Sequence, residues 1–125
     1  MHRIRHHVLR ALTAGAVLIA GTVAGHAAGA LAVGACGAYG FAYDYARTDE
    51  ARVAAQQKCK GNCKVVSLER ACAAYAVDSR NVCGPHGYAV AARLGEAQNT
   101  ALQKCYQFGG RDCMIRAFTC DGRKD

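Results

Sequence analysis

Residues 48–72 read TDEARVAAQQKCKGNCKVVSLERAC, and this stretch predicts the unit from which the fold is built. Thr48 can cap a helix that ends at Cys59, because a threonine oxygen accepts hydrogen bonds from the free amides of a first helical turn. Gly61 then stops the helix. A strand is predicted to open at Cys63. The stretch therefore predicts a helix, a tight turn and a strand, with one cysteine on each side of the turn.

The same plan returns in the second half of the chain. A second helical pattern ends near Cys105, glycines make the turn that follows, and a strand opens at Cys113. Two short strands with a cysteine-bearing loop between them are predicted before each helix, at residues 29–33 and 39–45 in the first half and at 72–77 and 86–90 in the second. The sequence thus predicts an α+β fold. Two pseudo-symmetric strand–strand–helix–strand repeats share a mainly antiparallel sheet that both helices cover, and disulfides stabilise it.

The first 27 residues have the three-part pattern of a secretory signal peptide. Three arginines make a basic start, residues 11–25 are apolar and uncharged, and Gly25 and Ala27 suit cleavage after Ala27. An uncleaved membrane anchor is the alternative, but the apolar run is shorter than the roughly 20 residues that a bilayer span needs. We therefore expect a secreted, extracellular protein with no stable membrane span after cleavage.

What remains after cleavage has the length of one small domain. We expect this domain at 28–121, with repeat one over 29–71, repeat two over 72–120 and a polar tail at 122–125. Thirteen basic and nine acidic residues remain, a net charge of +4, which fits a solvated exterior as well as an acidic partner. The only tight basic group is Lys58, Lys60 and Lys64. No arginine-rich run is present, so we expect no nucleic-acid partner.

Eight cysteines form a large set for a chain of 125 residues. In an exported protein an even number of cysteines predicts disulfides. The duplication favours the bridges Cys59–Cys63, Cys105–Cys113, Cys72–Cys120 and Cys36–Cys83. An alternative pairs cysteines within each half, as Cys36–Cys72 and Cys83–Cys120. Zinc binding is a further alternative, but only Cys59 and Cys63 are spaced like zinc ligands, and we expect no metal or cofactor.

The stock of catalytic side chains after cleavage is small. His86 is the only histidine, and Ser67 and Ser79 are the only serines, neither of them in a G-x-S-x-G setting. His86 stands where the first half has Tyr39, so it can simply fill a strand position. A carboxylate pair remains open as a route to glycoside hydrolysis. The carboxylates that could form it are Asp44, Glu69, Asp78, Glu96 and Asp112.

Aromatic side chains alternate along the strand predicted at 39–45, which places them on one face of it. They are Tyr39, Phe41, Tyr43 and Tyr45. We expect a helix to cover this face and make it part of the core, and the alternative is an exposed platform for a ligand. These four aromatics and His86 are the candidate ligand-binding residues.

Several segments together resemble the domain-of-unknown-function 4189 family, a group of small secreted bacterial domains with duplicated GAIAY-type repeats. The resemblance rests on GALAV at 29–33, YGFAY at 39–43, the alanine-rich helix ending in Cys59, CKVV at 63–66 and CAAYA at 72–76. It implies export and a duplicated α+β fold. Family members usually keep counterparts of Cys59, Cys63, Cys72 and Cys120, so the resemblance supports the pairs Cys59–Cys63 and Cys72–Cys120. No catalytic residue is implied.

The sequence favours a secreted binding module without catalytic activity, whose partner is a protein or a cell-envelope component. Two alternatives stay open. One is a small secreted hydrolase that uses carboxylates or His86. The other is an inhibitor of an extracellular enzyme that presents the disulfide-braced loop at 79–85.

Overall fold

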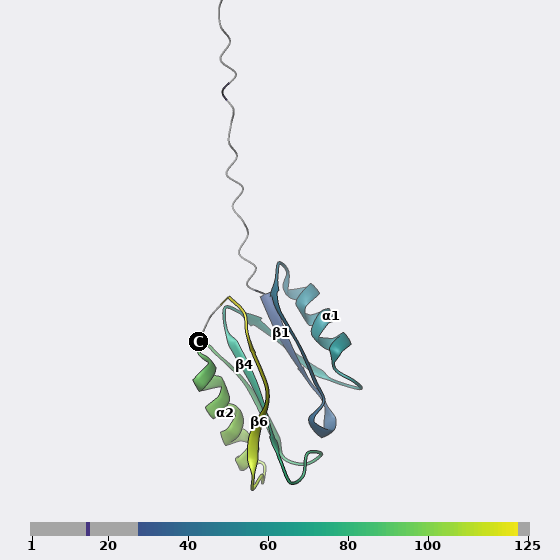
Figure 1. The fold of residues 1–125 in the computed structure, drawn as a ribbon, viewed down its shortest axis with the longest axis vertical. Coiled ribbons are helices and arrows are strands. Elements are labelled where there is room, and N and C mark those ends of the chain that lie inside the picture. The colour runs from purple at the N-terminus through teal and green to yellow at the C-terminus, as the bar shows by residue number, and fades with distance from the viewer. Residues whose placement is uncertain (1–14, 16–27, 123–125) are drawn as a thin grey trace, which may run out of the picture.

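The structure, a computed structural model, describes residue 15 and residues 28–122 (Figure 1). Apart from Gly15, the expected signal peptide lies outside the described residues, as does the end of the expected tail, residues 123–125. The elements follow one another as β1 (Ala28–Val33), the short 3-10 helix η1 (Ala35–Gly37), β2 (Tyr39–Tyr45), α1 (Thr48–Lys58), β3 (Lys64–Glu69), β4 (Cys72–Asp78), β5 (His86–Ala91), α2 (Leu94–Gln107) and β6 (Cys113–Cys120).

The two halves have the same order of elements, strand–strand–helix–strand, and this confirms the α+β fold with two repeat units. Each half builds its own antiparallel three-stranded sheet, in the orders β2-β1-β3 and β5-β4-β6. The expectation of one shared sheet is therefore wrong. The central strands β1 and β4 pair on both sides with strands of their own half, so the two sheets stack instead of joining edge to edge.

The molecule has four layers, with the two sheets face to face and one helix on the outer face of each (Figure 1). Side-chain size follows this layering. Between the sheets lie the larger side chains, among them the buried Leu31, Val33, Leu68, Tyr75 and Val77. Toward the helices the same strands carry small residues, among them the buried Ala30, Ala32, Ala74 and Ala76. The alternation along β1 and β4 therefore fixes which face of each sheet receives a helix.

Both helices lie directly on a strand backbone. A Cβ atom at Gly40 of β2 would come within 2.3 Å of the Ala55 carbonyl oxygen of α1, and one at Gly87 of β5 within 2.5 Å of the Ala101 carbonyl oxygen of α2. No side chain larger than hydrogen fits at either position. The two glycines are thus equivalent, and each sets the distance between a helix and its sheet.

We expect Gly87→Ala to destabilise the domain by about 1–3 kcal/mol, because the added methyl group forces α2 away from β5. Gly95→Ala is the matched control, since a Cβ there meets nothing within 4 Å. Gly95 lies in the first turn of α2, where alanine is the better helix former, so its replacement should change stability by less than about 1 kcal/mol. Denaturant unfolding with the disulfides intact measures both. Equal stability of the two variants would contradict this contact.

All eight cysteines are paired, as Cys36–Cys83, Cys59–Cys63, Cys72–Cys120 and Cys105–Cys113. These are the pairs that the duplication favoured. Two of them bridge the turn from a helix to the next strand, one in each half. Cys36–Cys83 joins the first half to the second, and both of its cysteines are exposed.

Candidate ligand-binding surface

The aromatic stripe of β2 is only partly as expected. Tyr39, Phe41 and Tyr43 follow one another on one face, with ring centroids 6.2 and 6.3 Å apart. Tyr45 packs instead beside α1, because Asp44 has a φ of 58° and interrupts the pairing of β1 with β2. The expectation that a helix covers the stripe is wrong, since Tyr39 and Phe41 pack against the core between the two sheets.

Four connections meet at one end of the molecule, which we call the loop end. They are residues 34–38, 59–63, 79–85 and 108–112 (Figure 1). Several bonds tie them together. Cys36 is bonded to Cys83, and the Ser79 amide donates to the Asp112 carbonyl oxygen at 2.9 Å. The Tyr75 hydroxyl donates to the Gly34 carbonyl oxygen at 3.0 Å, which links the second sheet to the first half.

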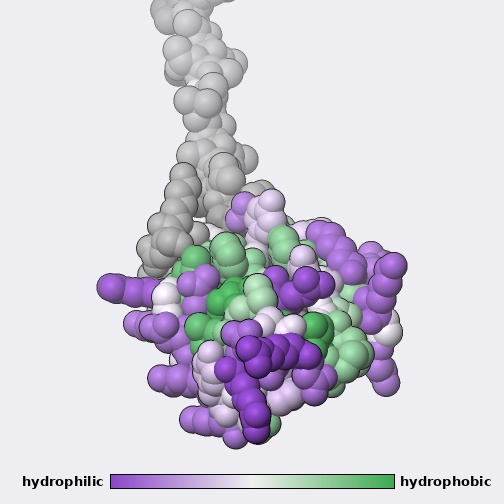
Figure 2. Space-filling model, turned by 60° about the horizontal axis from the view of Figure 1, so that its bottom comes forward, coloured by the Kyte–Doolittle hydropathy of each residue, from purple (hydrophilic) through white to green (hydrophobic). Residues whose placement is uncertain are grey.

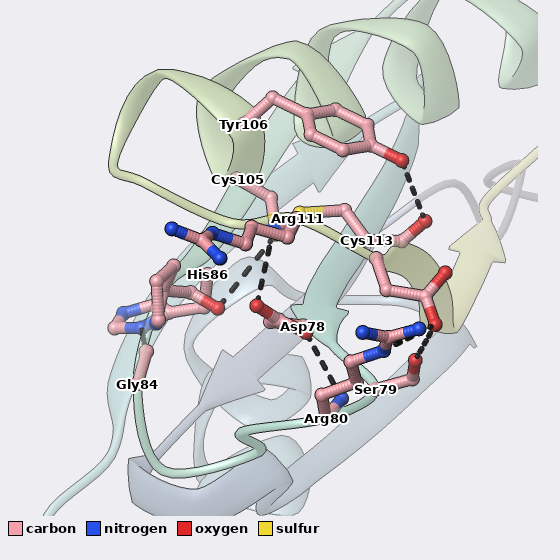
Figure 3. Close-up of a disulfide and its surroundings, with 11 residues drawn as sticks. Asp78, Ser79, Arg80, Gly84, His86, Cys105, Tyr106, Arg111 and Cys113 are labelled. Atoms are coloured by element: carbon pink, nitrogen blue, oxygen red, sulfur yellow. Dashed lines mark hydrogen bonds and ion pairs between the residues drawn. A yellow bond between two sulfur atoms is a disulfide. The ribbon is translucent and has the colours of Figure 1, made fainter.

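Asp78, the last residue of β4, holds two of these connections in place (Figure 3). Its side chain is buried, with an exposed fraction of only 5%. Oδ1 accepts the backbone N–H of Arg80 at 2.9 Å, and Oδ2 accepts that of Arg111 at 3.1 Å. These backbone hydrogen bonds hold the pKa of Asp78 below its usual value. The sequence pointed to Asp78 only as a possible catalytic carboxylate, although an aspartate just before a turn is a common backbone acceptor.

The opposite end has a similar clamp. Asp121 follows β6 and is fully buried, and its two oxygens accept the backbone N–H groups of Arg70 and Ala71 at 3.0 and 2.9 Å. When both oxygens of a buried carboxylate accept hydrogen bonds from the backbone amides of a turn, they hold that turn in place. The connection from β3 to β4 is therefore fixed by Asp121, directly after β6.

We expect Asp78→Asn to lower the midpoint of thermal unfolding at pH 7 by several degrees, because an amide nitrogen would face a backbone N–H donor. The stabilisation by an aspartate of lowered pKa is complete above the unfolded-state pKa, about 3.9, and is lost as the pH falls through the lower folded-state pKa. The difference from the wild type should therefore shrink in acid. Asp112→Asn, at an exposed site, is the control and should have a smaller effect. A difference of the same size at pH 7 and pH 2 would contradict this role.

Charge is distributed unevenly between the two ends. At and beside the loop end lie seven exposed cations: Lys58, Lys60, Lys64, Arg80, Lys104, Arg111 and Arg116. The described acids at this end are the exposed Asp112 and the buried Asp78. Toward the other end lie six described acids, Asp44, Asp49, Glu50, Glu69, Glu96 and Asp121, with four arginines, Arg47, Arg52, Arg70 and Arg93. The domain is therefore basic at one end and acidic at the other.

The helix dipoles account for only part of this separation. Both helices end at the loop end, so Lys58 and Lys104 in their last turns complement the partial negative charge there. Five of the seven cations lie outside the helices. Lys60, Arg80 and Arg111 come from three different connections, and only the fold brings them to one end. The sequence identified Lys58, Lys60 and Lys64 as a group but not the four cations of the second half.

Each half has a shallow hollow where its helix ends beside the start of its second strand. The first, of about 230 Å³, is lined by Gly37, Ala38, Tyr39, Lys58, Lys60 and Arg116. The second, of about 400 Å³, is lined by His86, Gly87, Tyr88, Lys104, Gln107 and Phe108. The equivalent lysines make equivalent bonds, since Lys58 Nζ donates to the Phe41 carbonyl oxygen at 3.0 Å and Lys104 Nζ to that of Tyr88 at 3.1 Å.

Beside each hollow, an aromatic ring makes a cation–π contact with a side chain of the opposite sheet. The Arg116 guanidinium of β6 lies 5.5 Å from the Tyr39 ring of β2, and its Nε donates to the Gly37 carbonyl oxygen at 3.1 Å. Lys64 of β3 lies 5.6 Å from the Tyr88 ring of β5, which Lys104 also approaches at 5.8 Å. Both halves thus contribute charge to each hollow, and cation–π contacts hold these cations at the surface.

In the structure His86 and the two serines each have a separate hydrogen-bond partner. His86 is exposed, with Nδ1 3.0 Å from the Gly84 carbonyl oxygen (Figure 3). The Ser79 hydroxyl donates to Asp112 at 2.8 Å, and the Ser67 hydroxyl accepts from Arg52 at 2.8 Å. Of the ligand-binding candidates, Tyr39 lines the first hollow and His86 the second.

The five candidate carboxylates do not share one site. Asp78 and Asp112 lie at the loop end and Asp44, Glu69 and Glu96 toward the other, and the amides described above already occupy Asp78. Within residues 28–122, no three His, Cys, Asp or Glu side chains gather as metal ligands would. Neither helix in this part of the chain is long and apolar enough to cross a membrane.

The fold and its four disulfides define a small, disulfide-stabilised α+β domain with a basic loop end. A family model described as a domain of unknown function (DUF4189) matches residues 28–120, and the chain belongs to this family. The match confirms the resemblance seen in the sequence. No curated protein and no solved structure matches the chain.

Proposed function

We propose that this protein is a secreted binding module without catalytic activity, and that it holds its ligand at the loop end. The observation that carries the proposal is the set of seven exposed cations there, beside a single exposed acid. Four disulfides are typical of proteins in oxidising compartments, which supports export, as does the signal-peptide pattern of residues 1–27. The ligand is an anionic component of a cell surface or envelope.

Rigidity at the loop end supports binding in particular. The Cys36–Cys83 disulfide and the Asp78 carboxylate fix the connections that carry Arg80 and Arg111 before any ligand arrives. A surface that is already ordered loses less conformational entropy on binding than a mobile one. The charges of this end thus form a fixed pattern that a ligand can match.

The first experiment compares two charge reversals in pull-down with envelope fractions. Lys60→Glu combined with Arg111→Glu alters the loop end, and Arg47→Glu combined with Arg93→Glu makes the same change in net charge at the acidic end. We expect the first variant to reduce the bound fraction roughly tenfold or more and the second to leave it nearly unchanged, because cations act over short distances at physiological salt.

Two results would overturn the proposal. Equal losses in both variants would mean that net charge, and not the loop end, governs retention. A hydrolase activity that is reproducible and that His86→Ala or a single carboxylate variant abolishes would make the protein an enzyme.

Inhibition of an extracellular enzyme is a second candidate, and the loop at 79–85 favours it. Residues 79–83 are exposed and are braced by Cys83, and the Arg80 side chain is 79% exposed. The loop is folded into turns, with the Asn81 amide bonded to the Asp78 carbonyl oxygen and the Gly84 amide to that of Asn81. Inhibition of an arginine-cleaving protease that Arg80→Ala removes would favour this candidate over the first.

A further inference from the structure

The loop end combines its cations with an unusual apolar side chain. Phe108, directly after α2, is 70% exposed, the highest value among the large hydrophobic residues of 28–122. It lines the second hollow with His86 and Lys104, and a neighbouring hollow with Pro85. Figure 2 shows hydrophobic surface between strongly hydrophilic side chains at this end of the molecule.

The backbone fixes Phe108 in this position. Its amide donates to the Lys104 carbonyl oxygen at 3.0 Å, and the Cys105–Cys113 disulfide holds the end of α2 against the start of β6. An exposed phenylalanine on a rigid helix end cannot withdraw into the core, so it remains available to an apolar environment outside the protein. The exposed Arg111 follows three residues further along the same connection.

We propose that the loop end docks on an anionic phospholipid surface. Phe108 enters the headgroup region, and the lysines and arginines of the loop end bind the lipid phosphates. This inference rests on the proposed function and names its ligand. A lipid surface offers anionic groups and hydrocarbon within a few ångströms of each other, and interfacial proteins use cations and aromatic residues together for that reason. A free polyanion would use the cations but would leave Phe108 without a role.

The acidic end supports the same orientation. Its six acids lie toward the end of the strands and helices that is remote from Phe108. An anionic surface attracts the basic end and repels the acidic one, and both effects fall off over a Debye length, about 8 Å at physiological ionic strength. The separation of charge therefore orients the domain with Phe108 toward the membrane before contact.

The experiment is co-sedimentation of the oxidised protein with two kinds of vesicle. One is made of phosphatidylcholine alone, and the other contains about 30% of the anionic lipid phosphatidylglycerol. We expect binding to the anionic vesicles only. Phe108→Ser should weaken that binding roughly tenfold, as loss of one buried aromatic side chain predicts, yet leave binding to soluble heparin unchanged. Phe118→Ser is the matched control, because Phe118 is 51% exposed but lies on β6 toward Cys120 and the acidic end. It should bind vesicles as the wild type does.

Three results would overturn the lipid proposal. The first is that the protein does not bind anionic vesicles. The second is that wild type and Phe108→Ser bind them equally. The third is that heparin displaces the protein completely from vesicles, and does so equally for wild type and Phe108→Ser. Retention by envelope fractions that still depends on Lys60 and Arg111 would then leave the proposed function standing with another ligand. Circular dichroism and intact mass with four disulfides establish that each variant is folded.

Discussion

The close approach of each helix to its sheet is the constraint on which the rest of the structure depends. Because α1 and α2 lie on the backbone at Gly40 and Gly87, the central strands β1 and β4 carry alanines on the faces that the helices cover. The larger side chains must then occupy the opposite faces, where each sheet can bury them only against the other sheet. The four-layer arrangement follows from this division of side chains by size, and neither half can bury its large residues alone.

Packing of the two sheets in turn creates the loop end. In both halves the central strand ends at the same end of the molecule, where both helices also terminate. The Cys36–Cys83 bond and the Tyr75 hydroxyl then connect the halves there. Cations from separate connections are brought together by this alignment, and Asp78 fixes the backbone that carries two of them. The charge pattern is thus a product of the fold, because no single segment of the sequence contains all the cations of the candidate binding surface.

The sequence was sufficient to predict the features that repeat in both halves. It was not sufficient to predict those that depend on how the two halves pack against each other. Periodicity and duplicated cysteine positions predicted the element types and all four disulfide pairs. Periodicity says nothing about which strand edges pair, so the single shared sheet was wrong. Perfect alternation also placed Tyr45 with Tyr39, whereas a left-handed residue at Asp44 reverses the face on which Tyr45 lies. The loop end was missed because it needs three-dimensional proximity of residues such as Lys60 and Arg111.

Two of the disulfides have a further consequence for how the chain withstands proteolysis. Cys36–Cys83 closes a ring of chain from 36 to 83, and Cys72–Cys120 closes a second ring from 72 to 120, so the rings overlap between 72 and 83. A protease that cuts one peptide bond anywhere between Cys36 and Cys120 therefore leaves both fragments covalently attached. Loss of a fragment requires at least two cuts or a reductant. The overlapping rings thus preserve the domain as one molecule even after its exposed connections have been nicked.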